Sequence, residues 1–275
     1  MNTLDFTALV ALGSFAAGLL GALTGLGGGV VIVPLLTLLF GVDIHYAIGA
    51  ALVSVIATSS GAAAAYLREG YSNIRVGMFL EVATTVGALT GAALVLHLRV
   101  SVISVIFGVV LLYSAYSSVS HTSHRSADGK ADRIATWLKM DSTYPTPNGP
   151  ERYHVRGVPL GFALMFVAGV LSGLLGIGSG AVKVLAMDKA MKLPFKVSTT
   201  TSNFMIGVTA AAGAGIYLSR GYIDPGLAMP VMLGVLAGSL LGAQLLGGAK
   251  VRVLRLVFSG VVAVLAAQMI YHGLK

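Results

Sequence analysis

The sequence predicts an all-α, polytopic membrane protein. Three observations predict this class: an apolar composition, long uncharged runs and an internal repeat. Of the 275 residues, 56% are hydrophobic and only 10% are charged, a balance that suits lipid rather than water. Most of the uncharged runs approach or exceed the roughly 20 residues that a helix needs to cross a bilayer. These runs are residues 6–42, 44–67, 82–98, 100–124, 157–182, 197–219, 225–249 and 256–274.

The runs are apolar on every face, whereas the strands of a membrane barrel alternate, so helices are favoured. The net charge of +8 does not indicate nucleic acid, because the basic residues lie in short connections between apolar runs. Membrane lipid with acidic headgroups is the expected partner of those charges. The chain has no cysteine, which excludes disulfides and thiolate metal sites. Neither a metal nor a cofactor is expected.

The two halves of the chain repeat each other. When Gly176 is aligned with Gly25, glycines, alanines and a Tyr-x₃-Gly-Tyr landmark coincide along most of both halves. Such sustained matching indicates duplication. We therefore expect a first transmembrane repeat at residues 1–120, a connector at 121–157 and a second repeat at 158–275. The connector is rich in basic and turn-forming residues, with a short helix expected around Ile134–Met140.

Each repeat contains a glycine-broken helix pair followed by three transmembrane helices. The broken pairs are expected at 7–41 and 158–192, and the single helices at 44–67, 76–98, 100–119, 197–219, 226–248 and 252–272, which makes 8–10 membrane segments. Whether the broken pieces span fully or re-enter stays open, but either way they add an even number of crossings. Each repeat then crosses an odd number of times, so the repeats are expected to be inverted.

Charge supports this topology. With the connector in the cytoplasm, the inner faces collect most of the Lys and Arg residues, and Arg99, Arg220 and Lys275 remain outside. This asymmetry follows the positive-inside rule for a cytoplasmic (inner) membrane protein and places both termini outside. A homodimer is left open.

The glycine strings at the two breaks are the first candidate site. "GLGGG" and "GIGSG" open helices near Val30 and Ala181, and an exposed helix N-terminus attracts an anion. The competing account is that the glycines only permit a tight turn and close packing. The motif positions are Gly25, Gly27, Gly28, Gly29, Gly176, Gly178, Ser179 and Gly180.

A hydroxyl-rich stretch in the second repeat is the second candidate. Ser198, Thr199, Thr200 and Asn203 lie at the start of a span, where they are able either to replace water around an anion or simply to cap the helix. The first repeat lacks this stretch, so the expected site is asymmetric.

Lys183 is the one Lys or Arg within an apolar helix. A cation at membrane depth indicates function, either as an anion partner or as half of a pair with an acid such as Asp188. Snorkelling to an interface is the competing account. Asp188, Glu81 and His45 are candidate proton relays. Glu81 also reads as an interfacial pairing residue, because a basic cluster is close in sequence.

Other motifs are absent or weak. Neither glycine string continues as a nucleotide-binding loop, and no nucleophile elbow or zinc-protease helix occurs. His121 and His124 lie in a polar loop, where an incidental role is favoured over metal binding. An enzyme is therefore disfavoured. The pairs Gly87/Gly91 and Gly238/Gly242 indicate close helix packing.

The strings "GLLGALTGLGGGVVIVPLL" from Gly18 and "GVLSGLLGIGSGAVKV" from Gly169 resemble the TauE/SafE family of membrane permeases, often called sulfite exporters. The resemblance implies export of sulfite or of organosulfonates such as sulfoacetate, and it carries over to the glycine positions only. The role expected of Lys183 is inferred separately, from its position within an apolar run. We therefore expect a secondary transporter that exports a small sulfur-containing anion by alternating access. A proton-coupled permease for another oxyanion, such as thiosulfate or sulfate, and an anion channel remain alternatives.

Overall fold

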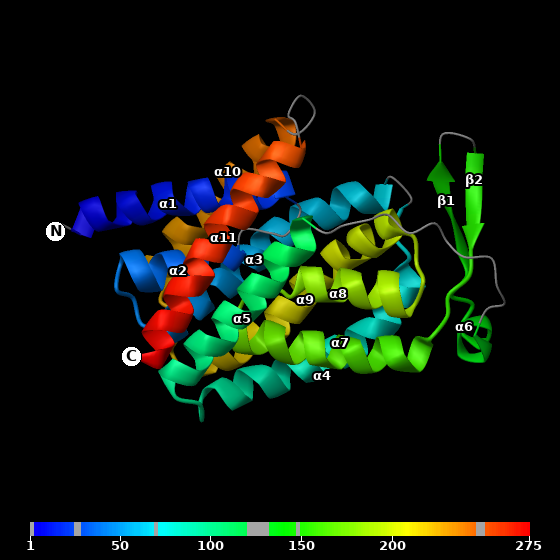
Figure 1. Ribbon diagram of the computed structural model, residues 1–275, viewed down its shortest axis with the longest axis horizontal. Helices are drawn as coiled ribbons and strands as arrows, with labels where there is room; N and C mark the ends of the chain where they lie inside the picture. Colours follow the sequence, from blue (N-terminus) through cyan, green and yellow to red (C-terminus); the bar gives the residue numbers. More distant parts are fainter. Residues whose placement is uncertain (1–2, 25–28, 69–70, 120–131, 147–148, 246–250) are drawn as a thin grey trace.

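The structure is a computed structural model that describes residues 3–24, 29–68, 71–119, 132–146, 149–245 and 251–275. Helices dominate it (Figure 1). The first half contains α1 (Thr3–Thr24), α2 (Gly29–Pro34), the π-helical segment η1 (Leu35–Leu39), α3 (Ile44–Arg68), α4 (Ile74–Val95) and α5 (Val100–Val119). The second half contains α7 (Val158–Leu175), α8 (Gly180–Leu185), the π-helical segment η2 (Ala186–Ala190), α9 (Phe195–Ser219), α10 (Pro225–Leu245) and α11 (Val251–Leu274).

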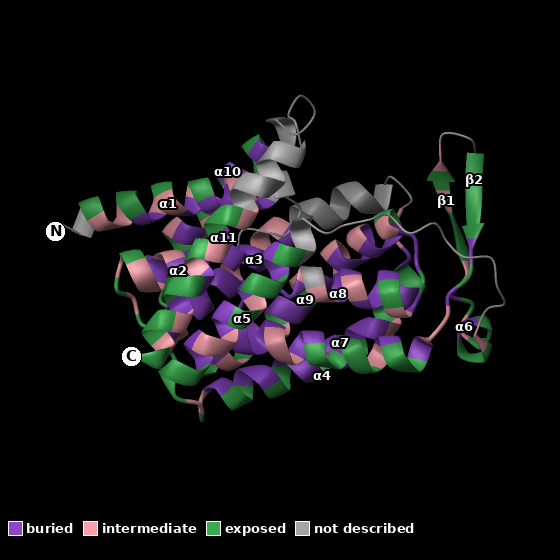
Figure 2. Cartoon of the chain, in the orientation of Figure 1, coloured by how far each residue is buried: buried purple, intermediate pink, exposed green. Residues whose placement is uncertain are grey.

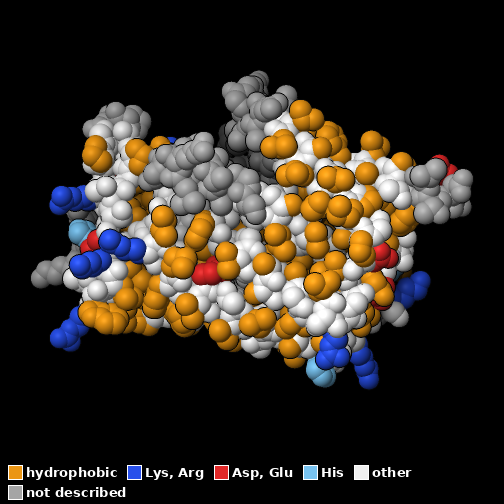
Figure 3. Space-filling model, turned by 180° about the vertical axis from the view of Figure 1, so that it is seen from behind, with side chains coloured by type: hydrophobic (Ala, Val, Ile, Leu, Met, Phe, Trp, Pro, Cys, Tyr) orange, Lys and Arg blue, Asp and Glu red, His pale blue; other side chains and the backbone are white. Residues whose placement is uncertain are grey.

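The outer surface of this bundle is apolar. Leu112, Leu164 and Leu233 are exposed, while purple interior faces in Figure 2 show where the helices bury one another. Hydrophobic side chains cover much of the face in Figure 3, and Lys and Arg lie toward the ends of the long axis. Among the described residues, α4, α7 and Pro225–Gly242 of α10 are long and apolar enough to cross a membrane. The expected helical membrane protein is confirmed.

The break in the second half occurs where its glycine string predicts it, whereas the break expected in the first half falls on residues 25–28, which lie outside the described residues. In each half a short α-helix of 6 residues runs into a π-helical segment of 5 residues. At 1.5 Å per residue these pieces extend about 16 Å, roughly half of the ~30 Å hydrocarbon thickness. The second member of each broken pair is therefore too short to cross a membrane by itself.

Helices of one half pack on helices of the other. Gly87 and Gly91 of α4 lie against backbone of α7, and Gly169 and Gly173 of α7 lie against backbone of α4. The same arrangement joins α1 to α10, where Gly18 faces Val235 and Gly234 faces Ala11. A side chain at these positions would collide with a neighbouring carbonyl, so the small residues permit the close approach.

The direction of these pairings follows from the contacts. Along α4 and α7, as along α1 and α10, residue numbers rise together at successive contacts, so the paired helices run parallel. In contrast, Gly108 of α5 meets Ala266 of α11 while Gly273 meets Ser101, so α5 and α11 run antiparallel. Helices α3 and α9 are also antiparallel, because Gly207 faces Ser59 and Gly213 faces Leu52.

The connector corrects the expectation of an all-α protein. It contains the short helix α6 (Arg133–Trp137), as expected, but also an antiparallel hairpin of β1 (Ser142–Thr146) and β2 (Gly149–Tyr153). The hairpin is possible because this segment lies outside the apolar runs, where strand edges can be hydrated.

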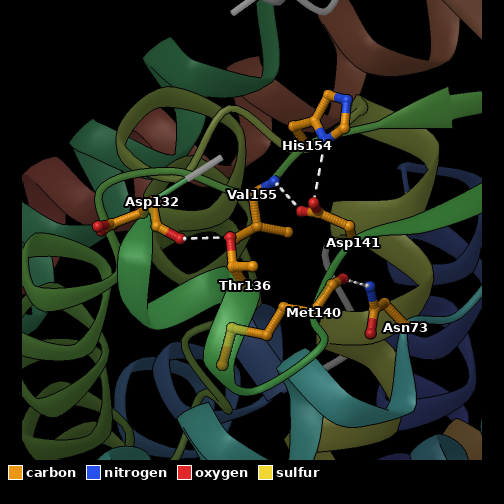
Figure 4. A network of polar contacts seen from close by, with 7 residues as sticks. All are labelled: Asn73, Asp132, Thr136, Met140, Asp141, His154 and Val155. Atoms are coloured by element: carbon orange, nitrogen blue, oxygen red, sulfur yellow. Dashed lines mark hydrogen bonds and ion pairs between the residues drawn. The ribbon is translucent and has the colours of Figure 1, made fainter. Parts of the chain in front are cut away.

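Polar contacts fix the connector to the bundle (Figure 4). The Asn73 side-chain amide, at the N-terminus of α4, donates to the Met140 carbonyl at 2.8 Å and to the Tyr153 hydroxyl at 2.7 Å. Asp141 accepts from the Val155 amide and pairs with His154, both at 2.9 Å. Because Tyr153 is 3% exposed, burial raises the pKa of its hydroxyl.

Candidate functional site

The second glycine turn is built by left-handed backbone. Gly176, the C-cap residue of α7, has a φ of 69°, Gly178 has a φ of 70°, and Ser179 has a φ of 49°. Glycine adopts this region without a steric penalty. A Cβ at Gly178 would lie 2.9 Å from the Ile206 side chain, and one at Gly180 would lie 2.8 Å from the same residue. The turn therefore combines positive φ with close packing on α9.

The first turn is described only at its end. Gly29 begins α2 and is buried, whereas Gly25, Gly27 and Gly28 lie outside the described residues. A Cβ at Gly29 would lie 3.4 Å from the Gly176 carbonyl oxygen and 3.7 Å from Ile177 Cα. The ends of the two breaks are thus in direct contact inside the bundle.

A small cavity lies where the breaks meet. Its lining comes from both halves: Val30, Val110, Ser114, Ile177, Ser179, Gly180 and Val182. The Ser179 side chain is 3% exposed, and its hydroxyl has no hydrogen-bond partner. A buried hydroxyl without a partner is unfavourable by about 1–3 kcal/mol, so the cavity presents a polar group that a ligand or a water molecule can satisfy.

Lys183, on the first helical turn beyond this cavity, is wholly buried, with 0% exposure. Its Nζ donates to Thr209 Oγ1 at 2.6 Å. The Thr209 hydroxyl donates to Glu81 Oε1 at 2.7 Å. Lys183, Thr209 and Glu81, from α8, α9 and α4, therefore form one buried polar chain. Because its side chain is buried and bonded to Thr209, Lys183 does not snorkel to a water-facing interface.

The surroundings of Glu81 are rich in hydroxyls. The Thr85 hydroxyl donates to Glu81 Oε1 at 3.3 Å, and Thr84 Oγ1 lies 3.4 Å from Thr209 Oγ1. Glu81 is 7% exposed, and its Oε2 atom is buried without a hydrogen-bond partner. The interpretation of Glu81 as an interfacial residue is wrong, because the acid lies about 12 Å along α4 from the cap at Asn73.

The hydroxyl-rich stretch divides its contacts between two roles. Thr199 donates to the Phe195 carbonyl at 2.9 Å and Thr200 to the Lys196 carbonyl at 3.0 Å, both within α9. These contacts fit the alternative in which the hydroxyl groups bond to their own helix rather than to an anion. Ser202 instead reaches the Gly180 carbonyl at 3.4 Å. Ser198 is 0% exposed with an unpartnered hydroxyl, and Asn203 is half-buried.

The remaining relay candidates lie on other elements of the structure, η2 and α3. Asp188 is buried on η2. His45 lies in the first turn of α3, near the C-terminal end of α9. Its Nδ1 lies 2.8 Å from Asp43 Oδ1, and its ring stacks on Tyr222 at a centroid distance of 5.0 Å. In the part of the chain that the structure describes, no group of three His, Cys, Asp or Glu could hold a metal ion.

Thr209 is the residue that sequence reasoning missed. A single threonine in an apolar helix gives no local signal. One signal for its neighbour was available, however: a buried cation needs an acid, and Glu81 is the acid of the predicted 76–98 helix. Asp188 is the acid nearest to Lys183 in sequence, but residues five apart do not share a helix face.

Comparison with known proteins also indicates a membrane transporter. A family model described as sulfite exporter TauE/SafE matches residues 10–269. The probable membrane transporter protein YunE of Bacillus subtilis (strain 168) is 28% identical over 98% of this chain and 99% of its own length. YdhB of the same organism, also a probable membrane transporter protein, is 29% identical over 86% of this chain and 89% of its own.

A third relative, the probable membrane transporter protein MJ0441 of Methanocaldococcus jannaschii, is 25% identical over 93% of this chain and 92% of its own length. No solved structure matches. Since the family model covers nearly the whole chain and the helices are apolar enough for a bilayer, the chain belongs to the TauE/SafE family of membrane transporters.

Proposed function

We propose that this transporter exports a small sulfur-containing anion, sulfite or an organosulfonate such as sulfoacetate, across the cytoplasmic membrane. The observation that carries the proposal is Lys183, a wholly buried cation on the first helical turn after the point where the two glycine breaks touch. Desolvating an ammonium group is costly, and an anion that reaches this point compensates part of that cost. The family description favours sulfite as the first substrate to test.

The expected binding groups suit a small oxyanion. Ser179 lines the cavity and its hydroxyl has no hydrogen-bond partner, and Lys183, one helical turn further along the chain on α8, donates to Thr209 of α9. The glycine positions let backbone approach the anion closely, with Ser198, Thr199, Thr200 and Asn203 completing the expected asymmetric wall. Hydroxyl donors bind an oxyanion without adding a fixed charge.

Alternating access is proposed as the mechanism, with residues 1–120 and 158–275 as inverted repeats around the site. The antiparallel pairings of α3 with α9 and of α5 with α11 support inversion, because these are equivalent helices of the two repeats and equivalent helices of inverted repeats run in opposite directions. In this arrangement the connector 121–157 is cytoplasmic and both termini are outside, in agreement with the charge bias.

The membrane potential favours this direction of flux. Each net negative charge that leaves a cell with a negative interior gains about 2.3 kcal/mol per 100 mV. A second candidate function, a proton-coupled permease for thiosulfate or sulfate, is favoured by the buried carboxyl group of Glu81 beside Lys183 and Thr209. A channel would differ from both by conducting without saturation.

Sulfite flux in proteoliposomes tests the proposal. We expect saturable flux in the wild type and a loss of at least tenfold in Lys183→Ala, with the folded state verified by size-exclusion chromatography and thermal unfolding. Lys189→Ala is the matched control, since Lys189 is exposed on η2. Unchanged flux in Lys183→Ala would contradict the proposed site. A thermal-shift panel of sulfite, thiosulfate, sulfate, sulfoacetate and chloride identifies the preferred anion.

A further inference from the structure

The charges of the candidate site balance without any substrate. Lys183 supplies the cation from the second half and Glu81 the carboxyl group from the first, with the Thr209 hydroxyl between them. The other described charged residues of α4 and of the elements around it are Arg75, Lys196, Asp188 and Lys189. Arg75 donates to the Lys139 carbonyl at 2.9 Å, and Lys196 lies over the Tyr71 ring at 5.2 Å. Asp188 and Lys189 are on η2.

The two oxygens of Glu81 have different environments. Oε1 accepts from Thr209 and from Thr85, whereas Oε2 is buried without a hydrogen-bond partner. Leaving a carboxylate oxygen buried and unsatisfied is costly. A proton on Oε2 removes the formal charge of the group while Oε1 keeps its two donors. The contacts of Oε1 are therefore compatible with either protonation state of the carboxyl group.

A small oxyanion presents the same chemistry as Glu81 Oε1, namely an oxygen that accepts from Thr209 and attracts the Lys183 ammonium group. One ammonium cannot balance two buried anions, because like charges a few ångströms apart repel strongly at low dielectric. If a transported anion pairs with Lys183 while Glu81 stays ionised, the buried site carries a net negative charge. Protonation of Glu81 avoids that cost.

We infer that Glu81 substitutes for the transported anion in the empty site and takes up a proton when an anion replaces it at Lys183 and Thr209. This inference rests on the proposed function and adds a co-substrate, the proton. A monoanion would then cross with one proton, without net charge movement. A dianion such as sulfate would still carry one net negative charge, so the membrane potential would still drive its export.

Proton counting during anion binding tests the inference. Sulfate, thiosulfate and sulfite are titrated into purified full-length protein by calorimetry, in buffers of different ionisation enthalpy. We expect about one proton taken up per anion bound and an affinity that falls about tenfold per pH unit once Glu81 is ionised. In Glu81→Gln the anion should still bind, but without proton uptake and with a flat pH profile.

The comparison with Glu81→Gln cancels any proton that the anion or the buffer contributes. Glu151→Gln is the matched control, because Glu151 is an exposed carboxylate on the connector hairpin, and it should behave as the wild type. Wild-type binding with no proton uptake would overturn the inference while leaving the proposed function intact. If no anion of the set binds, the proposed function fails as well.

A folding defect in Glu81→Gln does not remove the test, since the proton count of the wild type stands alone. In that case Glu81→Asp provides the second variant. It keeps a titrating carboxyl group on a shorter stem, so it should retain proton uptake of about one per anion with weaker binding. Loss of proton uptake in Glu81→Asp with retained binding would contradict the role assigned to this carboxyl group.

Discussion

Lys183 lies where a charge is most expensive, with no exposed surface and with apolar neighbours on the same helix. The free-energy cost of burying this ammonium group is reduced by its short hydrogen bond to Thr209 and, through the Thr209 hydroxyl, by the Glu81 carboxyl group. Replacing both ends of such a pair with neutral groups is commonly better tolerated than removing one end. A chain that kept this pair only for stability would gain little from it, which supports a functional reason for keeping it.

A double-mutant cycle measures how strongly the two charges depend on each other. Lys183→Met and Glu81→Gln should each destabilise the protein by roughly 3 kcal/mol, because each leaves a buried charge without its partner. The double variant should lose clearly less than the sum of the single losses. Thermal unfolding in detergent is the measurement, and strictly additive losses would show that the two residues act independently.

The hydroxyl of Thr209 can be tested separately from its volume. Thr209→Val keeps the shape but removes the donor to Glu81 and the acceptor for Lys183, so the site loses about 1–3 kcal/mol of interaction. We expect sulfite flux to fall roughly tenfold or more in Thr209→Val and to be largely retained in Thr209→Ser. Equal flux in the valine and serine variants would exclude a role for the hydroxyl group.

At the scale of elements, glycine determines how closely helices of the two halves approach. In lipid the hydrophobic effect contributes little to the association of helices, so close packing and weak polar contacts have to hold the helices together. Gly87 and Gly91 of α4, with Gly169 and Gly173 of α7, bring backbone directly onto backbone. Helices α1 and α10 repeat this seam, which explains why the same spacing occurs in both halves.

Adding one methyl group to this seam should weaken it. In Gly91→Ala the new Cβ would collide with the Val170 carbonyl, with the Leu174 amide nitrogen 3.0 Å away, and overpacking of this kind costs about 1–3 kcal/mol. Gly260→Ala on α11 is the control, because nothing lies within 4 Å of its Cβ position. We expect a lower unfolding temperature for Gly91→Ala only, and equal temperatures would mean that α4 and α7 pack more loosely than described.

Most helices could be predicted because membrane helices need long apolar runs, and such runs can be recognised in a single sequence. The break at Gly176–Gly180 could be predicted from its glycines, because glycine readily adopts the left-handed backbone conformation that the turn requires. The β1–β2 hairpin was not predicted, because its five-residue strands include Pro145 and Pro150 and show no alternation. The Lys183–Thr209–Glu81 chain depends on contacts between distant helices, which local pattern does not encode.

At the scale of the whole molecule, the candidate site belongs to neither half alone. Glu81 comes from the first half, Lys183 and Thr209 come from the second, and the cavity is lined from both. A rocking motion between the halves would therefore change the separation of Lys183 and Glu81 directly. Coupling of anion binding to such motion requires only that the anion pair with Lys183 better in one arrangement than in the other.

The relative orientation of the two halves can be measured with single cysteines, because the natural chain has none. Arg75 and Gly226 occupy equivalent exposed positions at the starts of α4 and α10. In inverted repeats these positions face opposite sides of the membrane. We expect a membrane-impermeant maleimide to label Gly226→Cys in intact cells and Arg75→Cys only in inside-out vesicles.

Two further variants make this experiment decisive. Thr143→Cys, exposed on β1 of the connector, should be labelled from the same side as Arg75→Cys, because Asn73 fixes the connector to that end of α4. Leu52→Cys, with 0% exposure, should be labelled from neither side and so reports unfolded protein. If Arg75→Cys and Gly226→Cys are labelled from one side, the repeats are parallel, and a site between oppositely directed breaks is ruled out.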